Sequence, residues 1–265
     1  MKKRLDLLLV ERGLAPSRTM AQALVLEGKI RVSGQTETKA SRSVADDAEI
    51  EVEAPPRFVS RGGEKLEGAF ALWGDVLDVS GRDCLDVGSS TGGFTDCLLQ
   101  HGAAHVMAVD VGTNQLAYKL RVDPRVWVRE NFNARFMKPS DLPKTPSVAV
   151  TDVSFISLRL ILPPIVEVLQ PGGLVVALIK PQFEVGKGNA PGGLVRDEAL
   201  RIAARDGIVE FAKGDLGLEL LGLAESPIRG REMGNVEYLS LWRRGASKLA
   251  FPVATRTSVL PQSPV

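Results

Sequence analysis

Hydrophobic and polar positions follow two different patterns, and the pattern changes part-way along the chain. In the first part, leucines at helical spacing over residues 5–9 predict one amphipathic helix, and Ser17 is placed to cap a second. Alternating residues at 29–34 and 50–53 predict two short strands. We therefore expect residues 1–54 to form a small α+β domain.

A second pattern, in which short apolar runs alternate with helical stretches, begins at residue 63. Seven of these runs are predicted strands, at residues 84–88, 106–110, 126–128, 148–153, 174–179, 218–224 and 238–242. Nearly continuous apolar strands separated by helices are typical of a parallel sheet that is covered on both faces. We therefore expect residues 63–245 to form an α/β domain with helices on both faces of its sheet.

Two segments lie outside these domains. Residues 55–62 contain two prolines and are expected to form a semi-rigid linker. Residues 246–265 are rich in Ser, Thr and Pro, and we expect them to form a disordered tail.

Composition changes this picture in one respect, because charge is unevenly distributed. The 265 residues carry a net charge of +1, but residues 1–45 hold nine Lys/Arg and four Asp/Glu, a net of +5, which leaves −4 elsewhere. This asymmetry predicts that the N-terminal domain binds a polyanion.

Two cysteines provide no disulfide framework and indicate a cytoplasmic setting. No apolar run approaches the roughly 20 residues that span a bilayer, so no membrane partner is expected.

Segments of the first domain, at residues 4–9, 17–25 and 28–34, resemble the S4 RNA-binding domain. The resemblance implies that its basic side chains contact structured RNA; they are Lys2, Lys3, Arg4, Arg12, Arg18, Lys29, Arg31 and Arg42. Phosphate contacts of this kind position a protein without reading sequence. A solvated charged face is the alternative interpretation.

A glycine-rich segment, Asp86-Val-Gly-Ser-Ser-Thr-Gly-Gly-Phe-Thr, follows the first strong strand of the second domain and opens a helix. Glycines there let the backbone approach a ligand, with helix N–H groups facing it. About 20 residues further on, the next strand ends at Asp110, where an acid typically binds ribose hydroxyls. The glycine spacing fits the nicotinamide fingerprint poorly. A tight turn without a ligand is the alternative.

Together these residues resemble the cofactor motif of class I S-adenosylmethionine (SAM) methyltransferases, and most closely that of the FtsJ-like ribose methyltransferases. The resemblance implies a Rossmann-like sheet and SAM as the cofactor. It assigns cofactor binding to Asp86, Gly88, Ser89, Ser90, Gly92, Gly93, Phe94, Asp110, Val111, Asn131 and Asp152. Of these, Asn131 is expected at the adenine edge.

Four ionisable residues are candidates for catalysis: Lys65, Asp152, Lys180 and Glu237. Asp152 and Lys180 each end a predicted strand, so both should emerge at the carboxyl edge of the sheet, where doubly wound folds bind ligands. A lysine can act as a base when burial and nearby positive charge lower its pKa, or it can stabilise an alkoxide as a cation. Ordinary charges at strand ends are the alternative, and Glu64 and Glu232 are rivals in sequence.

This set resembles the Lys-Asp-Lys-Glu tetrad of 2′-O-ribose methyltransferases. The resemblance implies that Lys180 is the base or alkoxide stabiliser, that Asp152 positions it, and that Lys65 and Glu237 complete the network. No metal is expected, because nothing near His101 in the sequence forms a ligand set. His105 is likewise interpreted as a surface residue, and Cys84 and Cys97 as small buried hydrophobic residues.

The domain order resembles the TlyA family, which joins an S4 domain to an FtsJ-like methyltransferase, and the resemblance covers roughly residues 3–245. It implies SAM-dependent 2′-O-methylation of cytidine in ribosomal RNA, with ribosomal RNA or subunits as partners of a cytoplasmic monomer. One alternative is an inactive methyltransferase fold that acts as a ribosome-assembly scaffold. Another is a membrane-active hemolysin, which is disfavoured by the lack of a spanning segment or a strongly amphipathic basic helix.

Overall fold

The computed structural model describes residues 2–53, 56–186, 188–230 and 234–246. The chain divides into two compact units, Met1–Arg57 and Phe58–Val265. The tail predicted at 246–265 lies outside the described residues, except for residue 246. Within the described part, no helix has the length and apolarity needed to cross a membrane.

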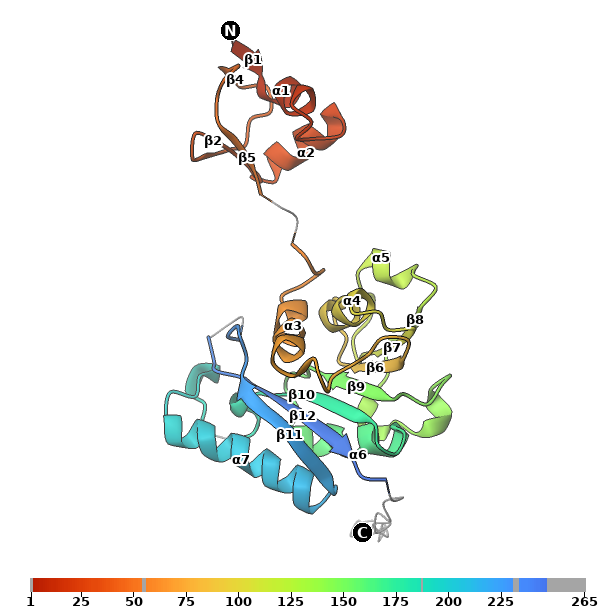
Figure 1. Cartoon of the computed structure of the whole chain (residues 1–265). Coiled ribbons are helices and arrows are strands. Elements are labelled where there is room, and N and C mark those ends of the chain that lie inside the picture. The colour runs from red at the N-terminus through yellow and green to blue at the C-terminus, as the bar shows by residue number, and fades with distance from the viewer. Residues whose placement is uncertain (1, 54–55, 187, 231–233, 247–265) are drawn as a thin grey trace, which may run out of the picture. The chain divides into compact units, whose positions relative to one another are not determined.

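The first unit is a small α+β fold (Figure 1). Its elements are β1 (Lys2–Arg4), α1 (Leu5–Glu11), α2 (Arg18–Leu26), β2 (Ile30–Val32), β3 (Gln35–Glu37), β4 (Ser43–Ala45) and β5 (Ile50–Val52). Strands β1 and β4 pair antiparallel, and β2 lies between β3 and β5. Ser17 caps α2 as predicted, because its Oγ accepts a hydrogen bond from Met20 N at 3.2 Å. Leucines of α1 pack against α2 and the three-stranded sheet to form the core.

The second unit is an α/β fold built on one seven-stranded sheet (Figure 1). Its strands are β6 (Asp83–Val87), β7 (His105–Val109), β8 (Val126–Arg129), β9 (Val148–Thr151), β10 (Leu174–Ile179), β11 (Leu218–Glu225) and β12 (Tyr238–Arg244). Its α-helices are α3 (Gly62–Trp73), α4 (Gly93–Gln100), α5 (Tyr118–Arg121), α6 (Leu158–Val168) and α7 (Glu198–Gly214). Short 3₁₀ helices are η1 (Ala134–Phe136), η2 (Pro139–Asp141), η3 (Pro181–Phe183) and η4 (Pro191–Gly193).

Helices cover both faces of this sheet, as predicted. Along β6, Leu85 and Val87 face a hydrophobic cluster that includes side chains of α6 and α7, whereas Cys84 faces a second cluster with α3 and α4. Because successive side chains of a strand point to opposite faces, an apolar run such as β6 supplies both cores at once.

One strand departs from the expected parallel sheet. The order is β11-β12-β10-β9-β6-β7-β8, and β12 runs antiparallel to both β10 and β11. The described residues between β11 and β12 form no helix, and the two strands pair as antiparallel neighbours rather than across a helical crossover. Ile179 at the end of β10 therefore pairs with Tyr238 at the start of β12.

The connection between the units is shorter than the predicted linker. Phe58 is buried in the second unit, and the next residue, Val59, donates its N–H to Asp96 Oδ2 at 2.9 Å. A Cβ on Gly63 would lie 2.2 Å from Phe58 Cγ, so the start of α3 packs directly on this ring. Residues 58–62 thus belong to the second unit, because an aromatic side chain within the stretch anchors it.

Candidate active site

The glycine-rich loop between β6 and α4 packs tightly against two other segments. Gly88 has a φ of 82°, and a Cβ there would lie 2.9 Å from Val153 Cγ1. A Cβ on Gly93 would lie 2.7 Å from Gly63 N. Side chains at these positions would push the loop away from the segment after β9 and from the start of α3.

Asp110, directly after β7, holds this loop in place. Its Oδ2 accepts a hydrogen bond from Ser90 N at 2.8 Å, and its Oδ1 accepts one from Gly112 N at 2.7 Å. The carboxylate is buried, whereas Val111 beside it is 72% exposed. Both residues line the same cavity, so an acid and an apolar side chain lie side by side on its wall.

Three adjoining cavities lie at this edge of the sheet, and Ser154 lines all of them. The loop cavity, of about 550 Å³, lies against the glycine-rich loop and the start of α3. The strand cavity, of about 560 Å³, lies against the ends of β6 and β7 and the segment after β9. The outer cavity, of about 350 Å³, lies beside η3 and η4. These volumes are typical of small-molecule sites.

Most of the predicted cofactor residues line these cavities. The loop cavity is lined by Gly88, Ser89, Ser90, Gly93, Phe94 and Asp152. The strand cavity shares Gly88, Ser90 and Asp152, and adds Asp110 and Val111. Three predicted residues line neither: Asp86, Gly92 and Asn131.

Asn131 is not part of the wall of the strand cavity. Its side chain is exposed, and its Oδ1 accepts a hydrogen bond from Thr113 Oγ1 at 2.7 Å. The next two residues, Phe132 and Asn133, line the cavity instead. Asn131 has a φ of 53°, and nothing in the sequence shows that the backbone turns there.

Asp86 lies beneath the glycine-rich loop. It is fully buried, and its Oδ2 accepts a hydrogen bond from Thr95 Oγ1 at 2.6 Å. Burial raises the pKa of Asp86 to about 7, although the bond from Thr95 acts in the opposite direction. Asp86 therefore joins β6 to the first turn of α4 below the loop.

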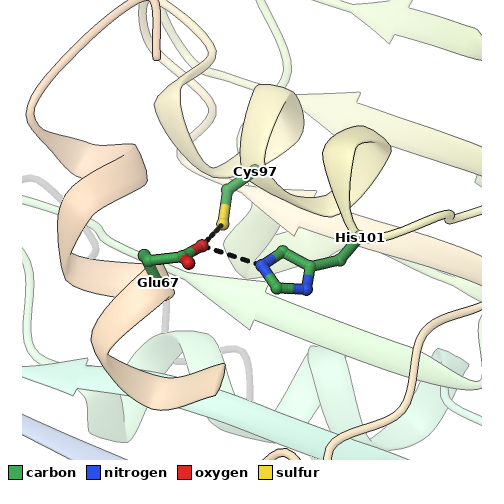
Figure 2. A group of neighbouring side chains, drawn as sticks. All are labelled: Glu67, Cys97 and His101. Carbon is green, nitrogen blue, oxygen red and sulfur yellow. Dashed lines mark hydrogen bonds and ion pairs between the residues drawn. The ribbon is translucent and has the colours of Figure 1, made fainter. Parts of the chain in front are cut away.

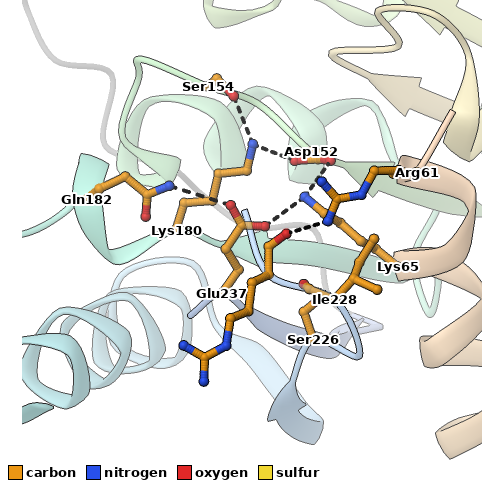
Figure 3. Close-up of polar contacts among 10 residues, drawn as sticks. Arg61, Lys65, Asp152, Ser154, Lys180, Gln182, Ser226, Ile228 and Glu237 are labelled. Atoms are coloured by element: carbon orange, nitrogen blue, oxygen red, sulfur yellow. Dashed lines mark hydrogen bonds and ion pairs between the residues drawn. The ribbon is translucent and has the colours of Figure 1, made fainter. Parts of the chain in front are cut away.

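The four predicted catalytic side chains meet at one edge of the sheet (Figure 3). Asp152 lies between two ammonium groups, with Oδ1 at 2.6 Å from Lys180 Nζ and Oδ2 at 3.4 Å from Lys65 Nζ. Lys65 Nζ also donates to Glu237 Oε2 at 2.7 Å. The side chains thus form a chain of alternating charge, in the order Lys180, Asp152, Lys65, Glu237.

Sheet topology explains why these residues converge. Strands β9 and β10 are parallel neighbours, so Asp152 and Lys180 follow strand ends at the same edge. Because β12 runs the opposite way, Glu237 before its first residue reaches this edge too. The fourth side chain, Lys65, comes from α3.

Burial makes the four charges interdependent. Lys65 and Lys180 are each 8% exposed, and Glu237 is 3% exposed. A buried charge is costly unless it is paired, and here each ammonium faces a carboxylate. The arrangement can hold a hydroxyl group of a ligand in the adjoining cavities beside a largely buried ammonium.

Two further residues contact this cluster and were not among the predicted site residues. Lys180 Nζ donates to Ser154 Oγ at 2.8 Å, and Gln182 Nε2 donates to Glu237 Oε1 at 3.5 Å. Each lies two positions after a predicted residue, Asp152 or Lys180. Closeness in sequence to Asp152 and Lys180 could have indicated these two residues. Their side chains are uncharged, however, so charge did not mark them as candidates.

Of the two rivals in sequence, the structure places Glu64 outside the cluster. Glu64 is exposed, on a different side of α3 from the buried Lys65. Glu232 lies outside the described residues.

Most of the predicted RNA-binding side chains hold partners within the first unit. Five of them form ion pairs: Lys3 pairs with Glu11 and Asp46, Arg4 and Arg18 both pair with Asp6, Lys29 pairs with Glu27, and Arg42 pairs with Glu37. A sixth, Arg12, donates hydrogen bonds to the backbone carbonyls of Asp46 and Ala48. Lys2 and Arg31 make no such side-chain contact with any described residue. The basic face is therefore a network of ion pairs that leaves positive groups at the surface.

Asp6 is the centre of that network. It is fully buried in the first turn of α1, with Arg4 at 2.9 Å, Arg18 at 3.0 Å and Gln22 at 2.9 Å. The hydrogen bonds from Arg4 hold the pKa of Asp6 well below its usual range, despite burial, and Gln22 and Arg18 act in the same direction.

The interpretation of His101 as an isolated surface residue was wrong. Its Nε2 lies 2.7 Å from Glu67 Oε2, and Cys97 lies beside the same carboxylate. The fold brings α3 against α4, which the sequence around His101 does not reveal. His105 instead contacts Asp83 and Lys144.

Comparisons with known proteins agree with this architecture. The FtsJ-like methyltransferase family matches residues 58–244, and the S4 domain matches residues 3–50. A Mycobacterium tuberculosis protein named 16S/23S rRNA (cytidine-2′-O)-methyltransferase TlyA is 45% identical over 246 residues, which cover 92% of this chain and 90% of the relative.

Two further relatives match over most of their length. Hemolysin A of Brachyspira hyodysenteriae is 44% identical, over 89% of this chain and 98% of that protein. A solved structure of a Streptococcus thermophilus protein is 42% identical with a TM-score of 0.71, and the match covers 93% of this chain and 90% of that one. The chain belongs to the FtsJ-like methyltransferase family and carries an S4 domain ahead of the methyltransferase domain.

Proposed function

We propose that this protein transfers a methyl group from SAM to the 2′-hydroxyl of cytidine in ribosomal RNA, in the cytoplasm where that RNA is found. The observation that carries the proposal is the buried Lys65–Asp152–Lys180–Glu237 cluster, which lies where the loop and outer cavities meet. The substrate class rests on the activity named for the Mycobacterium tuberculosis relative.

The residues of two cavities fit SAM in chemistry. The strand cavity joins the Asp110 carboxylate, which suits ribose hydroxyls, to apolar side chains such as Val111 and Phe132, which suit a flat base. The loop cavity adds the turn before α4, whose backbone suits the polar end of the cofactor. Because Gly88, Ser90 and Asp152 line both cavities, one extended ligand can occupy them together.

When bound, SAM supplies a methyl group on a positively charged sulfur. The protein must then orient the ribose hydroxyl and allow its proton to be removed. Lys180 Nζ is placed either to accept that proton as a neutral amine or, as an ammonium, to stabilise the oxygen as its negative charge develops. Asp152, at 2.6 Å, fixes the position of Nζ, and Ser154 Oγ accepts one of its hydrogen bonds.

Lys65 and Glu237 act through Asp152. Lys65 contacts the second oxygen of the Asp152 carboxylate and is itself held by Glu237. The pair therefore fixes the orientation of Asp152 and balances its charge. We assign Lys180 as the catalytic residue, and Asp152, Lys65 and Glu237 as positioning residues.

The S4 domain is proposed to dock the RNA. Its ion-pair network around Asp6 presents arginines at the surface in a fixed arrangement. Such groups bind phosphates without reading bases. Selection of the methylated nucleotide then falls to the methyltransferase domain, beside the outer cavity.

The test is transfer of labelled methyl from SAM to purified small subunits, large subunits and their naked RNAs, followed by digestion to nucleosides. The proposal predicts 2′-O-methylcytidine from at least one of them. Label on a base, or on another nucleoside, would overturn the assignment of the reaction or of the substrate. SAM binding without labelled RNA would favour the scaffold alternative.

A further inference from the structure

A second cluster of chemically reactive side chains lies outside the active site, between α3 and α4 (Figure 2). Glu67 comes from α3, whereas Cys97 lies on α4 and His101 directly follows it. Glu67 Oε2 is 2.7 Å from His101 Nε2 and 3.7 Å from Cys97 Sγ. All three candidate ligand atoms lie within 4.8 Å of one another.

We propose that Glu67, Cys97 and His101 form a zinc-binding site with three protein ligands and one water. A thiolate, an imidazole and a carboxylate are the three side-chain groups that proteins use to bind Zn²⁺. The sulfur ligand favours zinc over magnesium or calcium, which prefer oxygen ligands. The proposal is independent of the methyl-transfer reaction.

Local geometry directs the three groups to one point. Cys97 on α4 and His101 at its C-cap are four positions apart, about one helical turn, so both side chains can face α3, against which α4 packs. The His101 ring stacks on Phe70 of α3, with centroids 3.7 Å apart and planes inclined by 8°. This contact fixes the ring so that Nε2 points toward Glu67.

The two distances from Glu67 require only a small adjustment to hold the ion. Zinc bonds of about 2.3 Å to sulfur, 2.0–2.1 Å to nitrogen and 2.0–2.2 Å to oxygen place tetrahedral ligand atoms roughly 3.4–3.6 Å apart. The contact between Cys97 and Glu67 is close to that value. The contact between His101 and Glu67 must lengthen by less than about 1 Å, which side-chain rotation of Glu67 can supply.

Exposure of the cluster suits an ion that enters from solvent. The side chains of Glu67 and His101 are 31% and 28% exposed, so a water molecule can reach the fourth position. Cys97 is buried, which shields the sulfur on the side away from the ion. As the Zn–S bond forms, the Cys97 S–H bond breaks and its proton goes to solvent, so binding strengthens as pH rises.

Zinc here would join the two helices that border the active site. Glu67 lies two residues after Lys65 on α3, and α4 begins at Gly93 of the glycine-rich loop. An ion that binds only the folded protein stabilises it by an amount that grows with the logarithm of its concentration once this exceeds Kd. We therefore expect the thermal midpoint to rise with zinc concentration.

The experiment uses the metal-free full chain, with Zn²⁺ and with Co²⁺ as a spectroscopic probe. One equivalent of Zn²⁺ should bind, and Co²⁺ should give the charge-transfer band of a thiolate ligand. Cys97→Ala should abolish the band. His101→Gln and Glu67→Gln should weaken zinc binding by more than the roughly 10–100-fold that loss of an outer contact costs.

The chain offers matched controls, because it contains one other cysteine and one other histidine, Cys84 and His105. Cys84→Ala and His105→Gln should keep the band and the stoichiometry. The His101 side chain is partly exposed, so we expect the His101→Gln variant to fold. Circular dichroism verifies this. A missing thiolate band, or equal losses in control and site variants, would overturn the proposal whether or not the protein methylates RNA.

Discussion

Lys65 and Glu237 form an ion pair of 2.7 Å although 172 positions separate them in the chain. Lys65 lies on the helix that begins the second unit, and Glu237 directly precedes β12. Their contact depends on the antiparallel direction of β12, which returns the chain to the edge where β9 and β10 end. The pair therefore connects sheet topology to the position of Asp152.

Loss of this buried pair should destabilise the protein. Glu237→Gln removes the charge that lies 2.7 Å from the Lys65 ammonium and leaves Asp152, at 3.4 Å, as its charged partner. We expect the free energy of unfolding to fall by about 3 kcal/mol, the low end of values for broken buried pairs. Urea denaturation measures this. Glu219→Gln is the control, because its pair with Arg243 is exposed and should contribute less than about 1 kcal/mol. Equal effects of the two substitutions would contradict the assignment.

Asp6 should make the stability of the S4 domain depend on acid pH. Its pKa is lowered in the folded state, so the ionised form stabilises the fold above the unfolded-state pKa of about 3.9, and this contribution is lost as pH falls through the lower native pKa. At pH 7, Asp6→Asn should lower stability by about 1–3 kcal/mol.

Amide hydrogen exchange of residues in α1 and α2 of the full chain, measured from pH 7 downward, tests this. The difference between Asp6→Asn and the unmodified protein should shrink below about pH 4. Asp47→Asn is a control, since Asp47 lies in the same unit but outside the Asp6 network. A difference that stays constant with pH would show that the Asp6 charge is not responsible.

Asp86 should have the opposite pH dependence. Burial raises its pKa to about 7, so the folded protein holds the proton more tightly than the unfolded chain, whose pKa is about 3.9. The contribution of Asp86 to the free energy of unfolding therefore falls as the pH rises from about 4 to 7. Asp86→Asn should remove that decrease, so its stability relative to the unmodified protein should improve over this range. Thermal unfolding of the two proteins at pH 5 and at pH 8 measures this. If the difference between their thermal midpoints were the same at both pH values, Asp86 would not be a buried carboxyl group with a raised pKa.

Gly93 should be required for cofactor binding. A Cβ there would lie 2.3 Å from Ser60 Oγ and 2.7 Å from Gly63 N, so Gly93→Ala must separate the loop from the start of α3. We expect SAM affinity, measured by calorimetry, to fall at least about tenfold, which is about 1.4 kcal/mol. Gly214→Ala is the control, because a Cβ at that helical position would meet nothing within 4 Å. Unchanged affinity in Gly93→Ala would place the cofactor elsewhere.

Much of this architecture could be predicted from the sequence because local signals carry it. The run that ends at Ile179 is apolar throughout, so β10 and the position of Lys180 at its end follow directly. Glycine-rich turns and strand-end acids are likewise local features. Asp110 illustrates this, since its two backbone contacts lie within 20 positions of it.

Other features could not be predicted, because they depend on packing between distant segments. Nothing near Glu237 shows that β12 runs antiparallel, and nothing near His101 shows that α3 brings Glu67 to it. Asn131 differs from its expected position for another reason: its φ of 53° marks a backbone turn, its side chain bonds Thr113, and Phe132 lines the strand cavity.

In the proposed reaction, Lys180 acts on the ribose hydroxyl. Lys180→Ala should change SAM affinity by no more than about threefold, because the glycine-rich loop and Asp110 provide most of the proposed cofactor contacts. It should lower the rate of methyl transfer by about 100-fold or more, which is the range of general acid–base contributions. Lys180→Arg distinguishes the two roles, since an arginine can stabilise an alkoxide but cannot accept the proton. Lys144→Ala, at an exposed lysine paired with Asp83, is the control and should be fully active.

The most direct measurement is single-turnover transfer of labelled methyl to the RNA substrate by the unmodified protein, Lys180→Ala and Lys144→Ala, each saturated with SAM. We expect 2′-O-methylcytidine from the unmodified protein and from Lys144→Ala, and almost none from Lys180→Ala. Normal transfer by Lys180→Ala with SAM bound would contradict this expectation, because the buried cluster would then have no part in the reaction.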